Sequence, residues 1–135
     1  MKSYARVFLL VAILLGCDHP AAPREGIDLS HAVRVAPSAQ YITWWNELEA
    51  CSGLSGDIHA VSFYVLPNDT TVKVGNESYW GYWIEAGDRI VLAGPWANDE
   101  KLVKHEEMHA LLQSPLHPPA YFEGACGDLA YPEEG

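Results

Sequence analysis

Basic residues are scarce in this chain. Its 135 residues include 8 Lys and Arg against 18 Asp and Glu, which gives a formal net charge of −10. So acidic a surface cannot neutralise phosphates, which argues against a nucleic-acid-binding protein. Hydrophobic residues nevertheless make up 49% of the chain and there are 5 tryptophans, more than is typical of a disordered acidic segment. Length and composition therefore predict one packed domain with an acidic surface.

The sequence also lacks a long hydrophobic run near its start. The apolar stretch from Val7 to Leu15 has nine residues. As a helix it would extend about 14 Å, roughly half of a bilayer's hydrocarbon core, so it does not predict a transmembrane anchor. Because Lys2 and Arg6 precede it, the stretch is typical of a secretion signal.

The apolar stretch leads into Leu14-Leu15-Gly16-Cys17 without a small-x-small cleavage pattern. These four residues resemble the lipobox of bacterial lipoproteins. The resemblance implies that residues 1–16 are a signal peptide, and that Cys17 is lipidated and holds the exported protein at the periplasmic or extracellular face of a bacterial membrane. The alternative is an ordinary cleaved signal that happens to contain a cysteine.

Cysteine is rare as well, with 3 in the whole chain. If Cys17 carries lipid, Cys51 and Cys126 remain as an even pair in an oxidising compartment, so we expect a disulfide between them. This bond would close a loop of about 76 residues and contribute on the order of 4–5 kcal/mol in the chain-entropy model. The alternative is two buried free thiols.

The chain after the signal divides into a tether and a domain. Residues 17–37 contain Pro20, Pro23 and Pro37 and have weak apolar content. They predict a tether between lipid and domain, with little regular structure. Residues 38–135 then form the domain.

Within this domain the sequence predicts an α+β fold, with a small antiparallel or mixed sheet packed against two helices. Ser38 can cap the first helix, whose aromatic residues recur at helical spacing and which ends at Ser52-Gly53. The second helix is expected at about 98–113, capped by Asn98 or Asp99, with a short irregular tail after it. The strand-like stretches are 60–66, 70–74, 78–85 and 89–93.

The second predicted helix contains His105-Glu106-Glu107-Met108-His109, an H-E-x-x-H pattern. Residues four apart on a helix share one face, so both imidazoles can reach one metal ion. Zn²⁺ suits imidazole nitrogen and lowers the pKa of a bound water towards about 7, while Glu106 can take the proton of that water. The pattern therefore favours a zinc hydrolase, against an alternative in which both histidines are ordinary polar residues of an amphipathic helix.

His105-Glu106-x-x-His109 on a helix after a small sheet resembles the zincin metallopeptidases. More narrowly, the chain resembles small bacterial lipoproteins with a zincin-like motif, in which a His-Pro pair and a cysteine follow the helix, here His117-Pro118 and Cys126. The resemblance implies a zinc cofactor and peptide cleavage with Glu106 as the general base. It also implies an edge strand that binds an extended substrate, either 89–93 or its hairpin partner.

A catalytic zinc site usually has three protein ligands, so a third is needed besides His105 and His109. His117 is the first candidate, because a proline-forced reversal after the helix can return it to the metal. Glu123 is the second candidate and Asp128 the third. A disulfide at Cys126 would limit how far all three can move.

The sequence thus predicts a monomeric, membrane-anchored zinc peptidase that acts on a peptide or protein substrate and binds no nucleic acid. Two alternatives remain open. One is a zinc-binding lipoprotein without catalytic activity, serving as a binding or assembly factor at the membrane. The other is a structural lipoprotein without metal.

Overall fold

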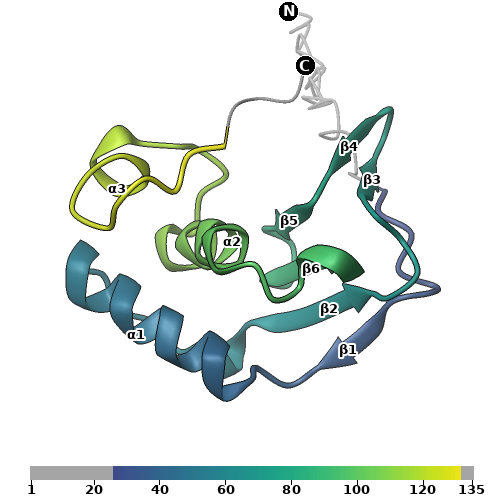
Figure 1. The fold of residues 1–135 in the computed structure, drawn as a ribbon, viewed down its shortest axis with the longest axis horizontal. Coiled ribbons are helices and arrows are strands. Elements are labelled where there is room, and N and C mark those ends of the chain that lie inside the picture. The colour runs from purple at the N-terminus through teal and green to yellow at the C-terminus, as the bar shows by residue number, and fades with distance from the viewer. Residues whose placement is uncertain (1–25, 132–135) are drawn as a thin grey trace, which may run out of the picture.

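A sheet of four strands forms the centre of the fold, and two helices lie against one of its faces (Figure 1). The computed structural model describes residues 26–131. Across the sheet the strands are β1 (Val33–Val35), β2 (Ser62–Leu66), β6 (Arg89–Ala93) and β5 (Gly81–Ile84). The β2–β6 pair is parallel and the other two pairs are antiparallel, so the sheet is mixed, as the sequence allowed.

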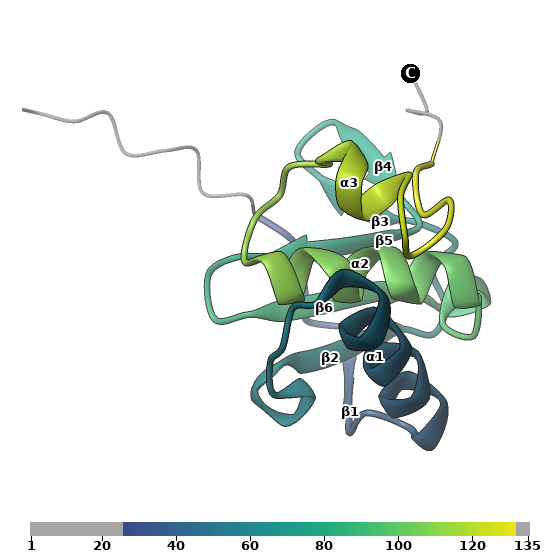
Figure 2. The same cartoon turned by 90° about the vertical axis from the view of Figure 1, so that its left-hand side faces the viewer.

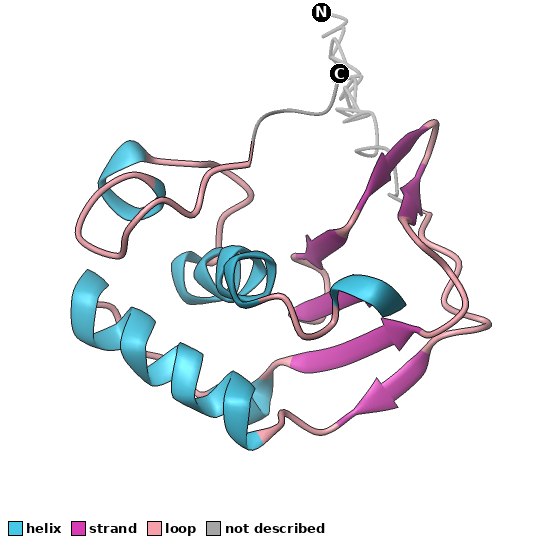
Figure 3. Cartoon of the chain, viewed as in Figure 1, coloured by secondary structure: helices cyan, strands magenta, loops and turns pink. Residues whose placement is uncertain are grey.

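The remaining elements surround this sheet (Figure 3). Strands β3 (Val72–Val74) and β4 (Glu77–Tyr79) pair with each other in a separate hairpin. The helices are α1 (Ala39–Ser52), α2 (Glu100–Leu112) and the four-residue α3 (Pro119–Phe122). Single 3₁₀ turns occupy Ile58–Ala60 and Gly94–Trp96.

Helix α1 forms where its capping residues predict it. The Ser38 side chain accepts a hydrogen bond from the Tyr41 amide, and Gly53 ends the helix with a φ of 75°. A left-handed residue at this position is common after helices and suits glycine, which has no Cβ. The buried residues of α1 are Tyr41, Trp44, Trp45 and Leu48.

Helix α2 crosses the sheet face beside α1 (Figure 2). Asp99 caps its start by accepting a hydrogen bond from the Leu102 amide at 2.8 Å. At its other end Gln113 takes a left-handed conformation with a φ of 51°, and the chain turns back over the helix. This turn places the loop that follows α2 above the helix rather than beyond its end.

Both faces of the sheet are covered, so strand β6 is buried on each side. Ile90 and Leu92 face the helices with Phe63 and Trp83, whereas Val91 and Ala93 face the β3–β4 hairpin and the segment around Ile27. The helical face therefore has the larger core. In this core α2 packs against β5, the edge strand of the sheet.

The structure corrects two predictions of local structure. Val33–Val35 form strand β1 and pair with Val65 to Phe63 of β2, so the prediction of little regular structure in 17–37 is wrong for these residues. The single strand expected at 78–85 is two strands in different sheets, β4 and β5, separated at Trp80. Trp80 marks the switch because its carbonyl already accepts a hydrogen bond from Ala93 of the main sheet.

The predictions for residues 1–25 lie outside the described part of the chain. These include the signal peptide, the lipidation of Cys17 and residues 17–25 of the tether. Among the described residues, no helix has the length and apolar character needed to cross a membrane.

Candidate metal centre

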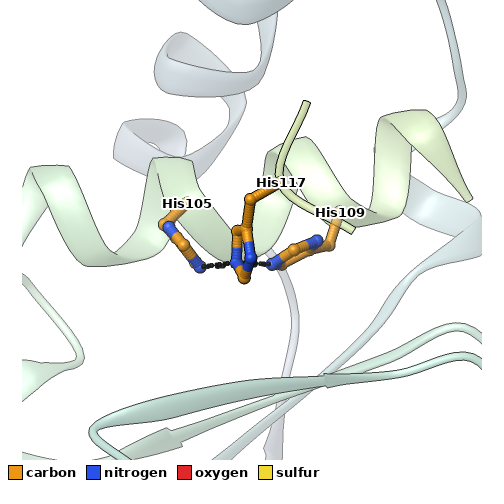
Figure 4. A group of neighbouring side chains, drawn as sticks. All are labelled: His105, His109 and His117. Carbon is orange, nitrogen blue, oxygen red and sulfur yellow. Dashed lines mark hydrogen bonds between the residues drawn. The ribbon is translucent and has the colours of Figure 1, made fainter. Parts of the chain in front are cut away.

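Three histidines meet on one side of α2 (Figure 4). His105 and His109 come from the helix, one turn apart, and His117 reaches over from the loop that follows it. Their Nε2 atoms form a triangle, because each of the three separations is 3.1 Å. Among the described residues, these three histidines form the group of potential ligand side chains that lie close enough together to hold a metal ion.

Backbone carbonyls fix how the two helical imidazoles are oriented. Nδ1 of His105 lies 2.7 Å from the Leu129 carbonyl oxygen, and Nδ1 of His109 lies 2.8 Å from that of Ser114. A carbonyl only accepts hydrogen bonds, so each Nδ1 carries the proton and donates it. In the neutral imidazoles the Nε2 atoms then present lone pairs towards each other and towards His117.

This arrangement fits a metal ion better than hydrogen bonding among the rings. Two unprotonated nitrogens 3.1 Å apart cannot donate to each other, whereas a cation between them satisfies both lone pairs. Tetrahedral zinc with bonds of about 2.0–2.1 Å places its ligand nitrogens about 3.3 Å apart. The observed triangle is within a few tenths of an ångström of that spacing.

Burial keeps the two helical imidazoles neutral. His105 is 9% exposed and His109 is 5% exposed. Burial lowers the pKa of His105 to about 4 and that of His109 to about 3, with smaller contributions from the neighbouring histidines. Both rings are therefore uncharged at neutral pH, the form in which imidazole binds metals. His117, in contrast, is an exposed residue.

Two aromatic side chains support the histidines. The Phe122 ring lies with its centroid 5.0, 5.0 and 4.8 Å from those of His105, His109 and His117. Trp83 of β5 stacks beside His109, with the ring centroids 6.2 Å apart. Phe122 is 1% exposed, so its ring packs against the histidines and does not line an open pocket.

Glu106 lies between the two helical ligands and faces the strand β5. A Cβ atom on Gly81 would lie 3.1 Å from both Cγ and Oε1 of Glu106, a tighter contact than most Cβ atoms make, so a larger residue there would press on the carboxyl. Glu106 is 4% exposed, and burial raises its pKa to about 8, partly offset by a hydrogen bond from the Trp83 amide. The side chain is thus held in a defined place beside the histidines.

Strand β5 is the edge of the sheet nearest the site. The hydrogen bond from Ala93 to Trp80 fixes the alternation of the antiparallel β5–β6 pair, so the backbone groups of Gly81 and Trp83 point away from β6. Strand β6 itself lies between β2 and β5. Of the two candidates for a substrate-binding edge, 89–93 is therefore excluded and its hairpin partner β5 remains.

Glu107, the next residue, lies in the interface between α2 and α1. It is 0% exposed, and neither carboxyl oxygen has a hydrogen-bond partner among the described residues. Burial raises its pKa to about 9, with Lys104 opposing the change. Glu107 is therefore not solvated, because α1 covers this side of α2.

The Glu107 carboxyl is expected to make the free energy of unfolding depend on pH. Its pKa is about 9 in the folded protein against an ordinary 4.5, so between these values the folded state binds more protons and stability falls as the pH rises. From about pH 6 to about pH 8, the wild type should lose about 2.7 kcal/mol more than Glu107→Gln, which has no titrating group there. Urea unfolding of both proteins measures this difference, and parallel pH profiles would contradict it.

The other candidate ligands lie outside the cluster. Glu123 is exposed, and Asp128 is exposed and paired with Lys101 at 3.4 Å. His31 and His59 are exposed residues elsewhere in the fold. Of the three candidates for the third position, the structure therefore brings His117 to the other two histidines.

The cysteine pair fixes the tail that runs beside the centre. Cys51 and Cys126 have Cα atoms 5.1 Å apart, a separation compatible with the expected disulfide. Leu129, whose carbonyl orients His105, follows Cys126 by three residues. The sequence did not predict that the carbonyls of Leu129 and Ser114 orient the histidines. Every residue has a backbone carbonyl, so the sequence does not indicate which of them contacts a ligand.

The site thus combines three imidazoles suited to a metal with a buried carboxyl and the edge strand β5. Comparison of the chain with protein-family models, with curated proteins and with solved structures finds no match. The chemistry of the site is therefore inferred from its own geometry.

Proposed function

We propose that this protein is a zinc-dependent peptidase of the zincin type. The observation that carries the proposal is the triangle of three Nε2 atoms 3.1 Å apart, two of which are held unprotonated by backbone carbonyls. His105, His109 and His117 would hold the ion, and the coordination of zinc leaves a fourth position for water or substrate. An all-imidazole ligand set favours zinc over magnesium or calcium, which prefer oxygen ligands.

When bound, zinc lowers the pKa of a water molecule and polarises a carbonyl group. Glu106 would accept the proton of the attacking water on its carboxylate and return it to the leaving amine. Burial alone raises the pKa of Glu106 to about 8, and a cation held by the neighbouring histidines favours the ionised form that a base requires. The Trp83 amide keeps the carboxylate in place throughout.

Strand β5 supports a peptide as the substrate. The backbone groups of Gly81 and the carbonyl of Trp83 point to the sheet edge, beside Glu106 and His109, while the Trp83 amide is used by Glu106. An extended peptide can add to such an edge as a further strand, and its scissile bond then lies next to the histidines. Recognition through the main chain would depend little on the substrate's sequence.

The place of action follows from the N-terminal sequence. We propose that Cys17 is lipidated and that the domain acts as a monomer on peptides or proteins at the outer face of a bacterial membrane. The exported, oxidising location agrees with a disulfide between Cys51 and Cys126.

Metal removal tests the proposed activity. We expect a strong chelator to abolish cleavage of a mixed peptide library, and zinc to restore it after the chelator is removed. Magnesium is the control and should restore nothing, because three imidazoles bind it poorly. Mass spectrometry of the library follows the products. Cleavage that continues at full rate in the metal-stripped protein would contradict the proposal.

A further inference from the structure

We propose that the Cys51–Cys126 disulfide sets the metal affinity of the three-histidine centre, so that a dithiol reductant makes the centre release its metal. The inference rests on the metal centre of the proposed function but not on peptide cleavage. It assigns to the cysteine pair a regulatory role in addition to stabilising the fold.

The tail from Phe122 to Leu129 forms part of the centre at two points. The Leu129 carbonyl accepts the hydrogen bond from Nδ1 of His105 at 2.7 Å. The Phe122 ring packs against all three imidazoles. The tail therefore determines both the orientation of one ligand and the surface against which all three rest.

Phe122 and Leu129 are coupled to each other because backbone hydrogen bonds close the tail into a loop. The amides of Leu129 and Ala130 donate to the Phe122 carbonyl at 2.8 and 3.3 Å, and the Gly127 amide donates to Gly124 at 3.0 Å. Cys126 lies in the middle of this closed loop. A displacement of Cys126 is thus passed to Phe122 and to Leu129.

The disulfide is a second covalent link, besides the main chain, between this loop and the rest of the domain. Cys51 stands at the end of α1, whose Leu48 contributes to a small apolar cluster with Met108, Phe122 and Leu129. The Lys101–Asp128 ion pair also contacts the loop, at 3.4 Å, but the Asp128 side chain is 76% exposed and such pairs contribute little. Without the disulfide, the loop would still be restrained by the small apolar cluster and by the hydrogen bond from the Tyr131 hydroxyl to Asp99 at 3.1 Å.

The disulfide is open to a reductant. Both cysteines are half-buried, and a groove of about 300 Å³ beside α2 is lined by Cys126, Leu129 and Lys104 among others. A dithiol would transfer two electrons and two protons to the disulfide, which gives the thiols of Cys51 and Cys126, and would itself be oxidised to a disulfide. The loop then loses its covalent restraint, and the Leu129 carbonyl holds His105 less firmly.

The expected loss follows from the role of such partners. Removing the hydrogen-bond partner of a metal-binding histidine typically lowers metal affinity about 10- to 100-fold. We expect a decrease of this size on reduction, with the helices and sheet intact.

The experiment measures zinc affinity by competition with a chromophoric chelator, in the oxidised wild type, in the wild type reduced by a phosphine, and in the double variant Cys51→Ser/Cys126→Ser. The phosphine is used because it offers no thiol to the metal. We expect the reduced wild type and the double variant to bind zinc about 10- to 100-fold more weakly than the oxidised wild type. The zinc affinity of the double variant should not change when the reductant is added. The core variant Val61→Ala, in a different apolar cluster, should lose stability without losing zinc affinity.

Each contrary outcome has a separate meaning. Unchanged affinity after complete reduction overturns this inference and leaves the proposed function standing. An oxidised wild type that binds no zinc overturns both. Loss of the circular dichroism signal on reduction also overturns the inference, because the disulfide would then hold the fold and not specifically the site.

Discussion

Replacing Glu106 by glutamine is expected to lower kcat for peptide cleavage by about 10²- to 10⁴-fold, the usual contribution of a general base. The amide cannot accept a proton from water at neutral pH. Its oxygen still accepts the hydrogen bond from the Trp83 amide, and its volume matches that of the glutamate, so we expect the fold to persist. The three histidines are unchanged, and the variant should therefore bind zinc as the wild type does.

The matched control is Glu107→Gln, the same substitution one residue further along α2. Glu107 faces α1 and not the histidines, so this variant should cleave peptides at close to the wild-type rate. Initial rates and zinc content are measured for all three proteins. Equal rates for wild type and Glu106→Gln would exclude Glu106 as the base. If the zinc-loaded wild type cleaves nothing across a broad library, the catalytically inactive zinc-binding alternative replaces the peptidase.

Replacing His117 by alanine is expected to lower zinc affinity by about 10²- to 10³-fold. Structural zinc sites bind with about 10–16 kcal/mol from four ligands, which is roughly 2.5–4 kcal/mol for each. His117 is exposed and lies in a loop, so its removal should change the free energy of unfolding of the metal-free protein very little. Loss of affinity can then be assigned to the missing ligand.

Three control variants make this test specific. His59→Ala removes an exposed histidine outside the cluster, while Glu123→Ala and Asp128→Ala remove the other two candidates for the third position. All three should retain wild-type zinc affinity in the same chelator competition. If zinc affinity survives His117→Ala but falls in Glu123→Ala or Asp128→Ala, the third ligand has been assigned wrongly.

The two long helices were predictable because local chemistry decides where they begin and end. Ser38 and Asp99 cap α1 and α2 as expected, and the aromatic residues at helical spacing in α1 are buried. Strand β1 was missed because it has three residues in a proline-rich stretch and depends on pairing with β2, which lies 27 or more residues away. Long-range pairing of this kind leaves only a weak local signal.

The histidines of the site were predictable, whereas most of their surroundings were not. The H-E-x-x-H spacing places His105 and His109 on one helix face, and the reversal after Gln113 brings His117 back, as the prolines there suggested. The position of Gly81 against Glu106 depends on strand register, which the sequence does not reveal. The division of 78–85 into β4 and β5 likewise decides which strand forms the edge, and it depends on the tertiary contacts of Trp80.

Anomalous diffraction at the zinc absorption edge, from crystals of the zinc-loaded protein, tests the three-histidine zinc centre most directly. We predict a single peak at about 2.0–2.1 Å from the Nε2 atoms of His105, His109 and His117. A map without a peak at these atoms, or with zinc bound by Glu123 or Asp128 in place of His117, would contradict the proposed centre.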